Sequence, residues 1–127
     1  MIAIIVLVIS IIRIAVGIAP FVSGKHTLRL MKFPISYQNA ATLVMTRLFG
    51  VRDIGLGILS LLFMNQPDLF TSLLVVNLCM DAGDVLAFAI AYKSDAAMKS
   101  SALSSGGVAL LAVIGWTVAI MLQGSTL

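Results

Sequence analysis

Ionisable side chains lie inside stretches of this sequence that are otherwise apolar enough to cross a membrane. They are three arginines and three aspartates: Arg13, Arg47, Arg52, Asp53, Asp81 and Asp84. A charged side chain near the bilayer centre costs roughly 2.5–3.5 kcal/mol on insertion scales. Six charges facing lipid would cost on the order of 15–20 kcal/mol. We therefore expect these side chains to face one another, water or a ligand.

The aspartates could supply acid and base groups. Burial raises the pKa of a carboxyl group and a neighbouring arginine lowers it, so buried aspartates can be tuned for proton transfer. The sequence therefore predicts Asp53, Asp81 and Asp84 as catalytic residues, if the protein is an enzyme.

The arginines could hold a substrate. A guanidinium grips a carboxylate, enolate or phosphate oxygen pair with two parallel hydrogen bonds. We expect Arg13, Arg47 and Arg52 to bind substrate and Asn77 to orient it. Three arginines would also repel an organic cation, so the expected ligand is a small amphiphilic or anionic molecule.

Asn77, Asp81 and Asp84 follow an i, i+4, i+7 spacing, which places them on one face of a helix. Their oxygens could hold Mg²⁺ against a diphosphate, because hard cations prefer oxygen ligands. One such acidic segment in a chain this short is weak support for that alternative. The prediction is therefore a site with no metal and no cofactor.

Composition indicates an integral membrane protein. Of the 127 residues, 61% are hydrophobic and 10% are charged, whereas a soluble domain has about a quarter charged residues. The basic residues form no stripe interleaved with aromatic side chains, so nucleic acid is not an expected partner but membrane lipid is. Cys79 is the single cysteine, which excludes an intramolecular disulfide and a Cys-x-x-Cys redox pair.

Four segments are long enough to cross the hydrocarbon core, which needs about 20 apolar residues. Their approximate ranges are 2–22, 40–64, 69–92 and 105–122. The first lacks the basic start of a signal peptide and is expected to be a retained span. Residues 1–127 are thus predicted to form one all-α domain, a bundle of four transmembrane helices. Trp116, deep in the fourth segment, is expected to serve packing.

The connections predict the orientation. The first and third connections contain five Lys or Arg residues, and the second connection and both termini contain none. The positive-inside rule then places these two basic connections in the cytoplasm and both termini outside. In a bacterium the location would be the plasma or inner membrane.

The charges surround the second segment. Arg52 and Asp53 are neighbours in sequence, so they should not face each other, and each needs a partner on another helix. We therefore expect this helix to be central in the bundle or to line an interface in a homo-oligomer. Matched depth suggests that Arg47 pairs with Asp84 and that Arg13 or Arg52 pairs with Asp81.

Several functions fit these features. The charges could only hold the helices together, although a buried ion pair is weak evidence for stability. They could instead form a pocket for an amphiphile, with or without acid/base chemistry. Intramembrane Asp and Arg also mark transporters and proton relays. Finally, the protein could be an accessory subunit of a larger membrane complex.

Two short motifs resemble a known group. The segment RIAVGIAPFVSGK spaces Arg13, Gly17, Gly24 and Lys25 as in the opening of DoxX-like small membrane proteins. The segment RLFGVRDIGLG, residues 47–57, is similar to a motif of an uncharacterised relative of that group. The resemblance implies a four-helix bundle. Because that group includes apparent oxidoreductase-associated subunits, it also keeps the accessory-subunit alternative open.

Overall fold

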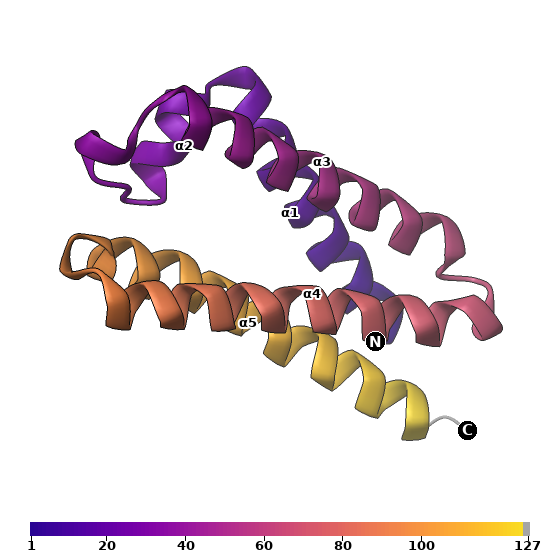
Figure 1. Ribbon diagram of the computed structural model, residues 1–127. Helices are drawn as coiled ribbons and strands as arrows, with labels where there is room; N and C mark the ends of the chain where they lie inside the picture. The colour runs from indigo at the N-terminus through magenta and orange to yellow at the C-terminus, as the bar shows by residue number, and fades with distance from the viewer. Residues whose placement is uncertain (126–127) are drawn as a thin grey trace.

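The computed structural model of the protein describes residues 1–125, and these residues form helices with no strand (Figure 1). Four helices are long: α1 (Ile2–Val22), α3 (Ala40–Phe63), α4 (Pro67–Ser94) and α5 (Lys99–Ser125). Three are short: α2 (Gly24–Leu30), η1 (Ile35–Tyr37) and η2 (Ala96–Met98). The predicted all-α fold is therefore confirmed.

Three helical stretches are long and apolar enough to cross a membrane: Ile2–Val22, Pro67–Ser94 and Ala96–Ser125. They indicate an integral membrane protein. Helix α3 has 24 residues, which is also long enough, but it includes Arg47, Arg52 and Asp53. Its charged side chains, rather than its length, set it apart from the other three.

Local signals define where the helices begin. Ser23 caps α2 by accepting a hydrogen bond from the His26 N–H. Asn39 and Thr42 form a capping box at the start of α3, each side chain accepting from the other's backbone N–H. Pro67 occupies the first turn of α4, where its missing N–H costs nothing. These signals fix the helix starts before any packing forms.

The two basic connections contain more helix than the sequence predicts. Helix α2 lies in the first connection, and α5 begins at Lys99 instead of about residue 105. Serines in this part of the chain lower its mean hydropathy, so the sequence pattern places the start of the apolar segment several residues after the start of the helix. The helix nevertheless continues because Ser101 and Ala102 are buried against the rest of the bundle.

The long helices form two closely packed pairs, α1 with α3 and α4 with α5, and the pairs contact each other much less (Figure 1). Glycines let α1 and α3 approach. A Cβ added at Gly17 would lie 2.5 Å from the Gly50 carbonyl oxygen, and one added at Gly57 would lie 2.9 Å from the Ser10 carbonyl oxygen. Backbone therefore packs on backbone in this pair, as small residues permit in membrane helices.

A small apolar core joins the two pairs at the end of the bundle near the α3–α4 turn. It consists of Val6, Phe70, Leu74, Trp116 and Ala119. Toward the opposite end, where α2 and η2 lie, charged and polar side chains replace this core. The bundle is thus packed firmly at one end only.

The second segment was expected to be central in the bundle or to line an interface in a homo-oligomer; it is not central within this chain, and the interface stays a prediction. One face of α3 packs on α1, but Leu48 and Val51 on its other face are exposed, and so is Arg47. The two charges that would forbid a lipid face, Arg52 and Asp53, both turn inward. The outer face of α3 is therefore left apolar except for Arg47.

The glycine contact between α1 and α3 gives a direct test. Gly50→Ala places a methyl group on the Gly17 carbonyl oxygen and should lower the free energy of unfolding by about 1–3 kcal/mol. Gly55→Ala is the matched control in the same helix, because nothing lies within 4 Å of its added Cβ. It should be neutral or stabilising by up to about 1 kcal/mol. Thermal unfolding in detergent, followed by circular dichroism, measures both, and equal effects would contradict the close contact.

Candidate functional site

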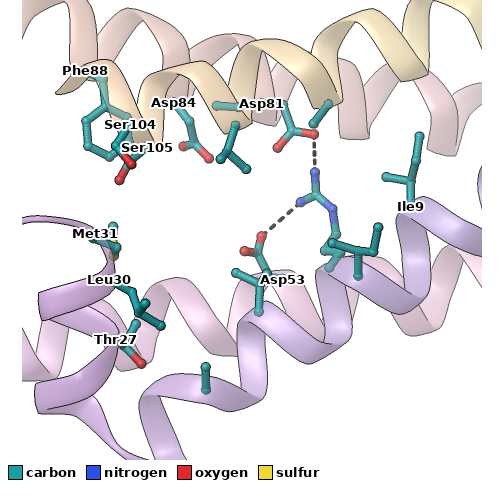
Figure 2. Close-up of a pocket in the computed structure, with 17 residues that line it drawn as sticks. Ile9, Thr27, Leu30, Met31, Asp53, Asp81, Asp84, Phe88, Ser104 and Ser105 are labelled. Carbon is teal, nitrogen blue, oxygen red and sulfur yellow. Dashed lines mark hydrogen bonds and ion pairs between the residues drawn. The ribbon is translucent and has the colours of Figure 1, made fainter. Parts of the chain in front are cut away.

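Arg13 lies at the centre of a buried cluster of charges. Its Nη1 donates to Asp53 Oδ1 at 2.9 Å, and its Nη2 donates to Asp81 Oδ2. Arg13 is 7% exposed and Asp81 is 5% exposed. Figure 2 shows Asp53 and Asp81 on opposite sides of the cavity, each with a dashed line that marks its ion pair. One guanidinium therefore connects α1 to both α3 and α4.

Trp116 adds α5 to the same cluster. Its indole Nε1 donates to Asp81 Oδ2 at 2.7 Å, and the Arg13 guanidinium carbon lies 5.9 Å from the centroid of its ring. The sequence predicts only packing for Trp116 and does not reveal this bond. The indole N–H could have indicated this bond, because a buried tryptophan usually finds a hydrogen-bond acceptor.

Arg52 forms the second centre of the cluster. Its Nη1 and Nη2 donate to the two oxygens of Asp84 at 3.1 and 2.7 Å, a bidentate pair between α3 and α4. Its Nη2 also lies 3.3 Å from Asp53 Oδ1. The prediction that Arg52 and Asp53 could not meet is therefore wrong. Neighbouring residues point in different directions around a helix, which is why no contact was predicted. The arginine side chain is nevertheless long enough to bend back and reach the carboxylate of the next residue.

The charge cluster is accordingly defined by five residues: Arg13, Arg52, Asp53, Asp81 and Asp84. The predicted pairing of Asp81 with Arg13 is confirmed. The predicted pairing of Asp84 with Arg47 is wrong, because Arg52 holds both Asp84 oxygens. Arg47 is exposed, lies near Gly24, and has no ion pair within residues 1–125.

Asn77 lies apart from the ligand-sized space described below. Its side chain is fully buried, and Nδ2 donates to Ser60 Oγ at 3.0 Å and to the Leu73 carbonyl at 2.8 Å. It thus joins α4 to α3 on the core side of Asp81. Within the described residues, no group of three His, Cys, Asp or Glu side chains could hold a metal ion.

A cavity of about 380 Å³ extends from the charge cluster toward α2. Arg13 and the three aspartates of the cluster line it, and most of the other lining side chains are apolar. Figure 2 shows Ile9 at one end, with Thr27, Ser104 and Ser105 at the other. Its volume is within the range of about 300–1,000 Å³ that is typical of small-molecule sites.

Two carboxylate oxygens at this cavity are available to a ligand. Both arginine bonds to Asp53 end on Oδ1, and both bonds to Asp81 end on Oδ2. Asp53 Oδ2 and Asp81 Oδ1 therefore have no hydrogen-bond partner in residues 1–125. Asp84 differs, because Arg52 occupies both of its oxygens. The carboxylates that line the cavity thus include two oxygens that no side chain of the described residues occupies.

The cluster also has a charge imbalance. Three carboxylates face two guanidiniums, so one formal negative charge is in excess. The sequence predicted a cluster with no net charge, because Arg47 was included as its sixth member. Because Arg47 lies outside the cluster, the buried charge is negative instead of balanced.

A hydrogen bond joins the two helix pairs beyond the cavity. Tyr37 in η1 donates its hydroxyl to Asp95 Oδ2 between α4 and η2, and the Ala97 N–H donates to Asp95 Oδ1 at 2.9 Å. The Tyr37 bond, with the Ala97 N–H adding to it, lowers the pKa of Asp95 below its ordinary value. The same bond and the carboxylate charge raise the pKa of Tyr37.

Residues 10–118 match the family model described as "Domain of unknown function (DUF4267)". The chain belongs to the DUF4267 family. The matched range includes every residue of the charge cluster in this DUF4267 chain, together with Trp116. The comparisons with curated proteins and with solved structures found no match. The resemblance to DoxX-like proteins stays a prediction. A function for this chain is therefore proposed from the geometry of the site.

Removal of Arg13 should destabilise the fold. Arg13→Leu leaves Asp53 and Asp81 without their shared partner, and breaking a buried ion pair costs about 3–5 kcal/mol of unfolding free energy. Arg47→Leu is the matched control, because Arg47 is exposed and has no ion pair within the described residues. Its effect should stay within about 0.5 kcal/mol. Thermal unfolding in detergent measures both variants, and similar losses would refute the central role of Arg13.

The Tyr37–Asp95 bond should stabilise the fold only between two pH limits. The lowered Asp95 pKa contributes stability above the unfolded value of about 4, which is lost as the pH falls through the folded pKa. The raised Tyr37 pKa contributes stability below about 10, which is lost as the pH rises through the folded pKa. Tyr37→Phe should therefore lower the melting temperature at neutral pH, and this difference should shrink at both extremes.

Tyr92→Phe is the control for that measurement, because it removes a hydroxyl from an exposed tyrosine and keeps the ring beside Lys99. It should leave the melting temperature unchanged at every pH. A constant difference between Tyr37→Phe and the wild type across the pH range would contradict the assignment.

Proposed function

We propose that this protein is a four-span membrane protein that binds a small amphiphile between its two helix pairs, with the polar group of the ligand at the charge cluster. The observation that supports this most directly is the pair of unused carboxylate oxygens, Asp53 Oδ2 and Asp81 Oδ1, at a largely apolar cavity of about 380 Å³. A ligand with hydrogen-bond donors at one end and hydrocarbon at the other fits both features.

Helix α3 is the proposed fourth span. Its 24 residues extend about 36 Å at 1.5 Å per residue, and the hydrocarbon core is about 30 Å thick. Arg52 and Asp53 form ion pairs within the cluster, and Arg47 can extend toward the headgroups near α2. With four spans, both basic connections share one side, which we assign to the cytoplasm, and both termini lie outside.

The proposed ligand is cationic or neutral. The cluster has one negative charge in excess, and its guanidiniums already bind carboxylates. An amine head would neutralise the excess and donate to both free oxygens, whereas an anion would add to the excess. The charge balance thus favours an amphiphilic amine over the anionic molecule expected from the sequence.

The charge balance also favours a second candidate, a proton-coupled carrier. The empty cluster would hold one proton on a carboxylate, and arrival of an ammonium group would release that proton to water. The same Asp53 carboxylate could act as a general base in an enzyme that acts on such an amphiphile. The carrier differs from both a static pocket and an enzyme because it moves the amine across the membrane.

Ligand binding can be followed through Trp116, the only tryptophan, whose indole N–H bonds to Asp81. In phosphatidylcholine nanodiscs, octylamine should shift the Trp116 emission saturably, and octanoate of the same chain length should not. Asp53→Asn should weaken octylamine binding on the order of tenfold, since it removes a charge-assisted hydrogen bond. Asp68→Asn is the matched control, because it removes an exposed carboxylate outside the charge cluster, and it should leave binding unchanged.

Tighter binding of octanoate than of octylamine would contradict the charge assignment, and binding of neither would refute the pocket. In proteoliposomes, octylamine flux that depends on a pH gradient would support the carrier, and its absence despite binding would leave the pocket as the function.

A further inference from the structure

A second cavity lies next to the first. Its volume is about 180 Å³, and it occupies the α3 side of the space between the helix pairs. Helix α3 supplies much of its lining, including Met45, Thr46 and Phe49, and α5 supplies none. The first cavity has the opposite arrangement, because α5 lines it extensively and Asp53 is the only residue that α3 contributes.

The two cavities share part of their lining. Five residues contribute to both: Val16, Thr27, Met31, Asp53 and Phe88. Asp53 is the charged residue of this set, so the same carboxylate is reached from both sides of the bundle. Its Oδ2, which has no partner in residues 1–125, is the acceptor that a ligand in either cavity would use.

The second cavity is apolar apart from Asp53. Three threonines line it, but each hydroxyl already donates to a backbone carbonyl: Thr27 to Ser23, Thr42 to Tyr37 and Thr46 to Thr42. These side chains therefore present mainly methyl groups to the cavity. The space suits a hydrocarbon branch better than a second polar group.

Side chains that can move separate the two spaces. Met31, which follows α2, and Phe88 of α4 line both cavities, and Figure 2 shows them at the same end of the first cavity. Methionine is unbranched and adapts its shape to irregular gaps.

We propose that the two cavities form one compartment for an amine with two hydrocarbon branches. The ammonium group would bind at Asp53, one branch would occupy the cavity beside α5, and the other would occupy the cavity beside α3. This inference rests on the proposed function and specifies its ligand class, a branched or secondary amine in preference to a single-chain primary amine.

Two isomeric amines test the compartment. Octylamine and dibutylamine contain the same atoms, but dibutylamine has two chains on its nitrogen. Lipid is as apolar as the cavities, so leaving water contributes little to the difference between the two amines. The preference for dibutylamine therefore depends on how well its two chains fit the cavities. In phosphatidylcholine nanodiscs, with Trp116 emission as the readout, dibutylamine should bind about fivefold tighter than octylamine.

Matched variants assign this preference to the second cavity. Thr46→Leu fills the second cavity only, and it should remove the preference for dibutylamine while octylamine binding stays unchanged. Ala109→Leu fills the first cavity only, and it should weaken both amines. Should Thr46→Leu lose its helical circular dichroism signal, Met45→Phe fills the same cavity from a more exposed position.

The outcomes separate this inference from the proposed function. Equal affinity for the two isomers in the wild type, or a preference that survives filling of the second cavity, would overturn the two-branched ligand and leave the amphiphile pocket intact. Failure of both amines to bind would overturn the pocket itself.

Discussion

The guanidinium of Arg13 is the interaction on which the rest of the structure depends. It is shared between Asp53 on α3 and Asp81 on α4, and Asp81 in turn accepts from Trp116 on α5. All four long helices therefore meet at one set of charge-assisted hydrogen bonds. Such bonds are roughly twice as strong as neutral ones, and few water molecules compete for them inside a membrane. The cluster can therefore hold together two helix pairs that have little apolar contact with each other.

The distribution of packing along the bundle explains why a cavity exists. At the end near the α3–α4 turn, Val6, Phe70 and Leu74 fill the space between the pairs. At the other end the pairs are joined by the Tyr37–Asp95 hydrogen bond, and between that bond and the charge cluster the side chains leave the cavities. A bundle that served only to hold itself together would fill this space, because interiors are normally packed densely.

The charge count is the basis for the ligand class that we propose. Both arginines of the cluster bind carboxylates, so the charge of each guanidinium is already compensated. Asp53 and Asp81 each keep one oxygen without a partner in the described residues, whereas both oxygens of Asp84 are bonded. The three carboxylates that line the cavity are therefore not equivalent, and we assign the proposed ligand contacts to Asp53 and Asp81.

The sequence by itself determined the helices and the membrane environment, because apolar segments of about 20 residues and capping residues such as Asn39 are local signals. It also narrowed the partner of Asp81 to Arg13 or Arg52, since a charge deep in one span needs a charge at the same depth in another. It could not separate Arg47 from Arg52, because both can reach the same depth, and only the packing of α3 on α1 decides which one turns inward. It could not assign Trp116 to Asp81 either, since no spacing rule relates residues on helices whose relative rotation is unknown. The tertiary structure alone therefore decided that three carboxylates share two guanidiniums, and that Asp53 and Asp81 each keep one oxygen without a partner in the described residues.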